Sequence, residues 1–322
     1  MRIHLPNSAF VGNIDPFLAS ISTDDSTRLD VTLNPNWVAV HPIVLSMTAA
    51  LASRVKSNNG TITCNAVSPR SKGYLVRMGL FDILGLDGGK PIQKHEPAGR
   101  FIPLTNVRDS LTLKKFIEDL SPLLHQSERP NQAEAIKYVV SELLRNVIEH
   151  AESPLGGFVC AQFFKKSNRV AIGVADTGVG VKKTINFAYS AETDSDAIRL
   201  ALTPGVTGTT TKPGGTETNA GAGLFFIKSI AKINKDYFLF YSGNAAYKLL
   251  KTPVKEKVRL YADPLKDKNS MKTSLPNWQG TAVGVDISVD ENQDFSELLG
   301  LIRQVYRLDA EDKRRFKRAK FI

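Results

Sequence analysis

The feature that most constrains the fold is a long amphipathic pattern over residues 129–151, RPNQAEAIKYVVSELLRNVIEHA. At about 100° per residue, the apolar side chains fall on one side of a helix: Ile136, Val140, Leu143, Leu144 and Val147. The opposite side carries Glu142, Arg145, Asn146 and Glu149. A helix of this kind packs its apolar side on a core, while its polar side faces either solvent or a ligand.

The segments around this helix alternate between helical and strand patterns. The periodicity predicts helices at 107–127 and 223–234, strands at 156–166, 169–178 and 280–289, and a hairpin at 236–250. Residues 203–220 are rich in Gly, Thr and Pro, which is typical of a mobile loop. The order predicts an α+β two-layer unit, with helices gathered on one face of a mostly antiparallel sheet.

A smaller α/β unit is expected before it. Short strands are predicted at 29–35 and 61–67, and helices at 41–60 and 71–85. Ser71 is a candidate N-cap of the second helix and Gly85 a candidate stop. The loop 86–100 marks a boundary, so we expect domains at 1–100 and 101–290 and a basic C-terminal helix or tail at 291–322.

Composition narrows the class of protein. The chain has 322 residues, 42% hydrophobic and 23% charged, with no apolar run long enough to span a bilayer. No signal peptide is apparent, and Cys64 and Cys160 alone make neither a disulfide framework nor a metal site, which favours the cytoplasm. The net charge of +10 is concentrated at 251–272 and 311–322, as solvated surface or as contacts to an anionic partner.

Three short motifs follow the long helix. In VADTGVG, Asp176 ends an apolar strand, and Gly178 and Gly180 permit a tight turn close to a ligand. In NAGAGLFFIKSI, Gly221 and Gly223 precede a helix whose free backbone N–H groups suit an anion. The dinucleotide-binding pattern is rejected because Phe226 occupies its last glycine position. In GTAVGVDI, Thr281 enters a strand.

Taken in order, these motifs resemble those of the Bergerat-fold (GHKL) ATPases. That family includes DNA gyrase B, a class of heat-shock chaperones, histidine kinases and mismatch-repair ATPases, with the anti-sigma serine kinases as relatives. The resemblance covers roughly residues 105–290 and rests on E-x-x-x-N in a helix, D-x-G-x-G after a strand, G-x-G-L before a helix and G-T on a late strand. It implies an ATP-binding domain that uses Mg²⁺.

The resemblance assigns the phosphate end of the site. Asn146 corresponds to the asparagine that binds Mg²⁺, and Glu142 to the general base that activates water. Gly221, Gly223 and Leu224 correspond to the phosphate-facing end of a lid. A carboxylate one helical turn from an amide is compatible with these roles, because Mg²⁺ takes oxygen ligands and a nearby carboxylate can accept a proton from water.

The resemblance also assigns the adenine end. Asp176 corresponds to the acceptor of the adenine amino group, and Gly178 and Gly180 let the base approach the backbone. Thr281 corresponds to the residue that helps to hold adenine through Asp176 and a water. The loop at 203–220 corresponds to the lid, which nucleotide would protect from proteolysis.

Other candidates stay open or are set aside. Lys212 or Lys228 could meet the phosphates, or be solvated. HQSERP, starting at His125, looks like a phospho-acceptor box but lies too close to Glu142 for a dimerisation hairpin. His150 is expected to pack beside the site.

The N-terminal unit resembles a STAS-like domain through TITCNAV and YLVRMGLFDILG. In anti-anti-sigma factors a serine near the equivalent helix start is phosphorylated, and Ser68 and Ser71 lie there, where helix capping is the simpler explanation.

The resulting expectation is a bacterial cytoplasmic, regulatory Mg-ATP-binding protein that hydrolyses ATP slowly to switch a contact with a protein partner or a second copy. The alternatives are an anti-sigma-type serine/threonine kinase and a non-enzymatic ATP-binding module. Nucleic acid binding through the tail residues Lys313, Arg314, Arg315, Lys317 and Arg318 is not favoured, and no membrane contact is expected.

Overall fold

The computed structural model describes residues 1–65, 69–88, 100–123, 130–206, 223–253, 255–288 and 299–305. The first part of the chain forms β1 (Arg2–Leu5), η1 (Val11–Asn13), α1 (Asp15–Ser20), β2 (Arg28–Leu33), α2 (Pro42–Ser57), β3 (Thr61–Cys64), α3 (Pro69–Arg77) and α4 (Leu80–Leu84). The second part begins with β4 (Phe101–Val107), α5 (Ser110–Leu123), α6 (Pro130–His150), β5 (Gly157–Phe164), η2 (Lys165–Ser167), β6 (Arg169–Asp176), α7 (Val181–Asn186) and α8 (Asp194–Ala201). It continues with α9 (Gly223–Ile233), β7 (Phe238–Gly243), β8 (Ala245–Leu249), η3 (Pro264–Lys266), β9 (Asn269–Lys272) and β10 (Trp278–Ser288).

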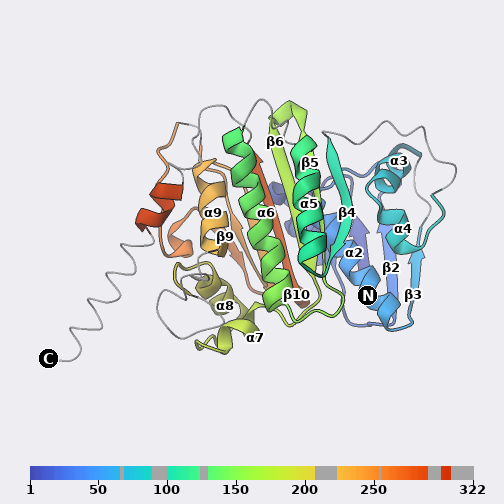
Figure 1. Ribbon diagram of the computed structural model, residues 1–322. Coiled ribbons are helices and arrows are strands. Elements are labelled where there is room, and N and C mark those ends of the chain that lie inside the picture. The colour runs from blue at the N-terminus through green and yellow to red at the C-terminus, as the bar shows by residue number, and fades with distance from the viewer. Residues whose placement is uncertain are drawn as a thin grey trace.

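The centre of the molecule is an antiparallel sheet with the strand order β4-β5-β6-β10-β7-β8-β9 among the described residues. Helices α5, α6 and α9 cover one face of it (Figure 1). The apolar stripe of α6 is buried there as its periodicity predicts: Ile136, Val140, Leu143, Leu144 and Val147 are at most 7% exposed. The expected α+β character of this part is therefore confirmed.

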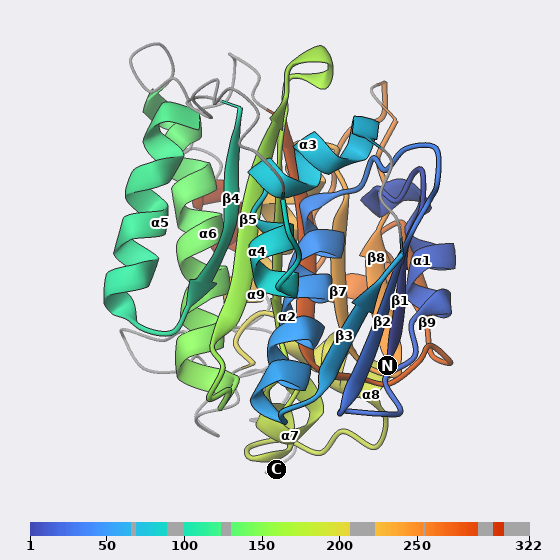
Figure 2. The ribbon, with the colours of Figure 1, turned by 90° about the vertical axis from the view of Figure 1, so that its right-hand side faces the viewer.

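The other face of the sheet is covered by α2, which lies between the large sheet and the parallel sheet β1-β2-β3 (Figure 2). Helix α2 is buried on nearly all sides because PIVLSMTAALA is apolar around its whole circumference. It approaches β6 so closely that a Cβ on Gly173 would lie 2.0 Å from the backbone nitrogen of Ile43. The Ser46 hydroxyl donates to the Gly173 carbonyl at 2.9 Å.

The N-terminal segment therefore shares a core with the large sheet. Side chains of β1, β2 and α2 belong to the same apolar cluster as Phe158, Cys160, Tyr241 and Trp278. The two expected layers of helix and sheet are followed by two more, α2 and the small parallel sheet. The expected boundary loop lies mostly at 89–99, outside the described residues.

Two local predictions are wrong. The single helix expected at 71–85 is two helices, α3 and α4, because Gly79 takes a left-handed conformation (φ 77°) between them. Ser71 is not an N-cap, since α3 begins at Pro69; the Ser71 hydroxyl is buried and accepts a hydrogen bond from the Val38 N–H at 2.8 Å. The stop at Gly85 is confirmed, with φ 75°.

The sheet brings two motifs together. Strands β6 and β10 are antiparallel neighbours with Ala175 opposite Ala282. The end of β6 at Asp176 therefore meets Thr281, near the start of β10, at one end of the sheet. Helix α6 lies over that end and forms the third wall of the site with Leu143, Asn146, Val147 and His150, where its polar and apolar sides meet.

Candidate functional site

A cavity of about 130 Å³ lies between α6, α7, α9 and the strands β6, β7 and β10. Its polar lining residues are Asn146, His150, Thr184 and Thr281. Its apolar walls include Leu143, Val147, Val174, Val181, Ile185, Leu224, Phe240 and Val283. An apolar cavity of about 150 Å³ accommodates benzene, so the enclosed volume here is close to that of a single aromatic ring, with polar groups at its edge.

Behind Thr281 lies a buried carboxylate, that of Asp176. The Thr281 hydroxyl donates to its Oδ2, and the backbone N–H of Gly178 donates to its Oδ1 at 2.8 Å. Asp176 is 1% exposed, and burial raises its pKa to about 6, although these hydrogen bonds oppose the shift. Within the part of the chain that the structure describes, no cation pairs with it. The charge is therefore only partly compensated, and a further donor would stabilise it.

The glycine turn after β6 is fixed by neighbours on both sides. A Cβ on Gly178 would lie 2.0 Å from the Ala151 carbonyl, so only glycine fits against the end of α6. Gly180 has φ 77° and lines the cavity. The Ser242 hydroxyl accepts from the N–H of the residue after Gly180 at 3.0 Å and donates to the Gly280 carbonyl at 2.6 Å. The turn is thus held in one position over the cavity.

On α6, Asn146 faces the cavity with its amide nitrogen unused. Its Nδ2 atom is buried, and no hydrogen-bond acceptor for it exists among the described residues. A buried amide without a partner costs about 1–3 kcal/mol. A side chain that keeps this cost in a cavity is typical of a binding site rather than of a packing position.

One turn earlier, Glu142 lies against the start of α9. A Cβ on Gly223 would lie 2.6 Å from the Glu142 Oε2, so the glycine leaves room for the carboxylate. Arg145 reaches Glu142 at 3.2 Å and Glu149 at 3.8 Å. Burial raises the pKa of Glu142; Arg145 opposes this shift and Glu149 adds to it. The carboxylate is thus made more basic than an ordinary surface glutamate.

The structure brings most of the sequence-derived candidates to this one place. Asn146, Gly180, Gly223, Leu224 and Thr281 line the cavity. Asp176, Gly178 and Glu142 stand directly behind that lining. Gly221, Lys212, Ser68, His125, most of the expected lid and the basic tail lie outside the described residues.

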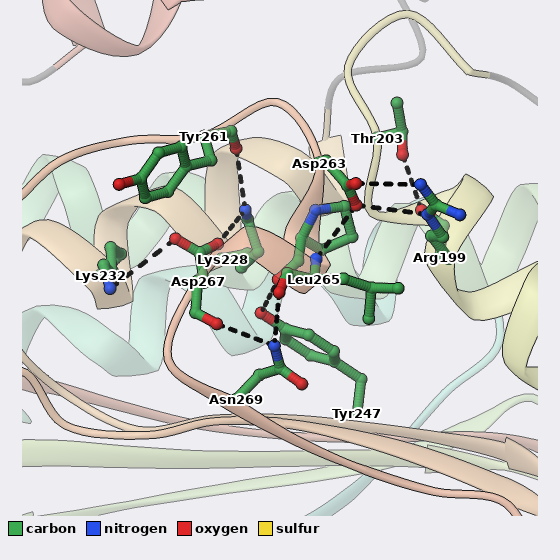
Figure 3. A network of polar contacts seen from close by, with 11 residues as sticks. Arg199, Thr203, Lys228, Lys232, Tyr247, Tyr261, Asp263, Leu265, Asp267 and Asn269 are labelled. Carbon is green, nitrogen blue, oxygen red and sulfur yellow. Dashed lines mark hydrogen bonds and ion pairs between the residues drawn. The ribbon is translucent and has the colours of Figure 1, made fainter.

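Lys228 is the open candidate that the structure settles. It is fully buried and its Nζ lies 2.6 Å from the Asp267 Oδ2 and 3.3 Å from the Tyr261 carbonyl (Figure 3). Lys228 therefore forms an ion pair with Asp267 and is not part of the cavity lining.

Sequence reasoning missed Ser242, Thr184 and Trp278. The indole of Trp278 donates to the Asp176 backbone carbonyl at 3.2 Å. The available signal was a tryptophan two residues before the Gly280-Thr281 pair.

Comparison with known proteins adds no family: no protein-family model and no curated protein matches the chain. Within the described part of the chain, no helix is long and apolar enough to cross a membrane. Groups of three or more His, Cys, Asp or Glu side chains able to hold a metal are likewise absent from the described residues.

Proposed function

We propose that this cavity binds the base of ATP, and that the chain is a regulatory ATPase of the Bergerat type with a STAS-like N-terminal part. The observation that carries the proposal is the Asp176–Thr281 pair, a buried acceptor whose charge is only partly compensated, at the edge of an apolar cavity. An adenine offers that pair an amino donor and offers the apolar walls a flat ring. The two other sequence motifs, E-x-x-x-N and G-x-G-L, contribute Asn146, Gly223 and Leu224 to the same cavity.

The phosphates would lie toward α6 and the start of α9. Asn146 would supply an amide oxygen to Mg²⁺ after rotation of its side chain, while the phosphates and water complete the coordination. A neutral amide oxygen suits this role because it leaves the charge balance to the ion and the phosphates. The unpartnered Nδ2 atom shows only that the side chain is not held by another acceptor among the described residues. Gly223 opens the N-terminus of α9, whose backbone N–H groups suit an anion.

Glu142 would act on water at the γ-phosphate. The water oxygen bonds to phosphorus, the bond from phosphorus to the bridging oxygen of ADP breaks, and Glu142 takes the proton. Its raised pKa favours that proton transfer. The nucleotide state would then switch a contact with a protein partner or a second copy of the chain.

Titration calorimetry with Mg-ATP tests the binding site. Asp176→Asn and Asn146→Ala should each weaken binding by about 100-fold or more, which is about 2.7 kcal/mol. Asp236→Asn is a matched control, because Asp236 is also buried with a pKa raised to about 6, but pairs with Arg169 at 2.8 Å. If wild-type protein binds no ATP, or if all three variants bind alike, the proposal is wrong.

Incubation with γ-labelled ATP separates the three reaction classes. Free labelled phosphate is the expected product. Labelled protein would instead show a kinase that transfers the phosphoryl group to a side-chain hydroxyl. Neither product, with ATP bound, would show a binding module. Ser71 is a poor internal acceptor, since its hydroxyl is buried beside Val38.

A further inference from the structure

The segment between β8 and β10 has most of its basic side chains facing solvent and most of its acidic side chains facing the protein interior. Its basic side chains outnumber its acidic ones: Lys251, Lys255, Lys257, Arg259, Lys266, Lys268 and Lys272 against Glu256, Asp263 and Asp267. All the basic side chains except that of Lys251, which is half-buried, are exposed. Of the acids only Glu256 is exposed, so the outward charge exceeds the net charge of the segment.

The two other acids point inward and form ion pairs with basic side chains of α8 and α9. Figure 3 shows Asp263 directed at Arg199 of α8 and Asp267 directed at Lys228 and Lys232 of α9. Asp263 holds the Arg199 guanidinium in a two-point contact at 3.2 and 2.9 Å. The side chain of Asp267 is 0% exposed and lies 2.6 Å from Lys228 and 3.7 Å from Lys232.

The backbone of this segment is anchored as well. The Tyr247 hydroxyl of β8 donates to the Pro264 carbonyl at 2.9 Å, and the Asn269 amide donates to the Asp267 carbonyl at 2.8 Å. The Tyr261 carbonyl accepts from Lys228 at 3.3 Å. These contacts fix the backbone of residues 261–269, so Tyr261, Lys266 and Lys268 project from an anchored part of the segment.

A stacking platform lies among these charges. The Arg259 guanidinium lies 5.3 Å from the centre of the Tyr261 ring. Paired aromatic and arginine side chains stack unpaired nucleic-acid bases, and neighbouring lysines follow the phosphate backbone. An acidic protein surface would use the charges but would gain nothing from the flat pair.

We propose that residues 251–272 form a docking surface for single-stranded nucleic acid. The phosphates contact Lys255, Lys257 and Lys268, and a base stacks on the Arg259–Tyr261 pair. This surface is separate from the nucleotide cavity, so the proposal does not depend on ATP binding.

Fluorescence anisotropy with a labelled single-stranded oligothymidylate tests the surface in the full chain. Between about 50 and 200 mM salt, the triple variant Lys255→Gln, Lys257→Gln, Lys268→Gln should lower the logarithmic salt slope by about 2, at about 0.7 per lost phosphate contact. Its affinity at the lower salt should fall by about tenfold or more. Unchanged thermal unfolding and unchanged ATP titration show that the variant is folded, and they keep this test apart from that of the proposed function.

Two controls remove the same charge elsewhere. One is Lys114→Gln, Lys165→Gln, Lys166→Gln, whose side chains are exposed on α5 and η2. The other is Arg315→Gln, Lys317→Gln, Arg318→Gln in the C-terminal tail. Both should keep the wild-type slope to within about 0.5.

Three results would overturn the proposal. The first is that wild-type protein binds no oligonucleotide at the lower salt, and the second is that a control triple variant loses as much affinity as the test variant. Polyglutamate that competes as well as the oligonucleotide would show a general acceptor of acidic chains instead. Tyr261→Leu supports the stacking role if it weakens binding without changing the salt slope.

Discussion

Asp176 and Asp267 are both buried aspartates, but they lie in opposite electrostatic surroundings. Asp267 has two lysines within 4 Å, and Lys228 is as buried as its partner. Asp176 receives only neutral donors, from Thr281 and Gly178, and its pKa is raised to about 6. Asp267 is paired with cations of the protein, whereas Asp176 has no cation beside it among the described residues.

The same contrast extends to the surrounding groups. Around Asp267, hydrogen bonds and ion pairs link α8, α9, β8 and the segment 261–269 (Figure 3). Around Asp176, the cavity edge also holds the unused amide nitrogen of Asn146. The two carboxylates differ in their counter-ions rather than in hydrogen bonding, because both Asp176 oxygens accept hydrogen bonds and Asp267 Oδ1 has only the ion pair with Lys232 at 3.7 Å. A buried charge without a cation is costly, so the surroundings of Asp176 favour a ligand and those of Asp267 favour a structural role. The difference predicts that mutations in the two regions will separate stability from binding.

The largest expected effect is on stability at the compensated pair. Asp267→Asn leaves Lys228 and Lys232 without their shared anion, and breaking a buried ion pair costs about 3–5 kcal/mol. Burial already lowers the pKa of Lys228, so its loss of a proton would relieve part of that cost. Chemical denaturation measures the change. Folded Asp267→Asn protein should still bind ATP within a few fold.

A double variant controls for this result. Lys228→Met with Asp267→Asn removes the stranded ammonium and should recover part of the lost stability. If Asp267→Asn unfolds at the wild-type denaturant concentration, the ion pair of Asp267 with Lys228 does not stabilise the fold. Asp267 would then not differ from Asp176 in its contribution to stability.

The second effect is on turnover at the uncompensated site. Glu142→Gln keeps the shape of the side chain and removes its basicity, so hydrolysis should fall by about 100-fold or more while ATP binding stays within a few fold. Glu149→Gln is the matched control, since Glu149 also contacts Arg145 but lies two turns beyond Glu142 on α6 and is more exposed. Single-turnover hydrolysis beside a binding titration measures both. An unchanged rate in folded Glu142→Gln protein would remove Glu142 from the chemistry.

Sequence patterns predicted the parts of the fold whose periodicity is strong. Helices α2 and α6 and the strands β5, β6 and β10 were found because each buries a face or a whole surface. Strand β4 was missed because Pro103 interrupts its pattern, and the register shift between Ile102 and Thr105 accommodates that proline. Helix α8 was missed although Thr193 and Asp196 form a capping box at its start.

The candidate site was predictable only as separate motifs. The spacing of Glu142 and Asn146 places both on one helical face, and the sequence shows this directly. The contact between Thr281 and Asp176 depends on the pairing of two strands far apart in the chain. Helix α2 can pack against the large sheet because Gly173 has no side chain at the point where the Ile43 backbone approaches it. The sequence alone does not show that Gly173 and Ile43 lie together in the fold.

The third effect is on nucleotide choice. An ionised Asp176 accepts a hydrogen bond from the adenine amino group, whereas guanine presents a carbonyl at that edge. GTP should therefore bind at least about tenfold more weakly than ATP, which is about 1.4 kcal/mol. Calorimetry with both nucleotides at pH 7.5 measures the ratio. Equal affinities would show that Asp176 does not distinguish adenine from guanine and is not the residue that binds the base.

The smallest effect is on pH dependence, and it tests the charge of Asp176 directly. Its pKa of about 6 lies above the ordinary 3.8, so the ionised fraction falls roughly fourfold between pH 7 and pH 5.5. Adenosine, which has no phosphate to titrate, should lose affinity by about the same factor. Guanosine should lose none, because a protonated carboxyl can donate to its carbonyl.

The same titration has the opposite sign for the free protein. Because folding raises the pKa of Asp176, its contribution to stability is fully present below about pH 4 and is lost as the pH rises through about 6. The stability difference between wild type and Asp176→Asn should therefore shift in favour of the variant as the pH rises from 4 to 7. Asp236, with the same pKa direction, cancels in that difference because both proteins contain it. A constant difference across this range would mean that Asp176 titrates alike in the folded and unfolded chain. Burial would then not raise the pKa of Asp176, and its carboxylate would gain little from a further hydrogen-bond donor on a ligand.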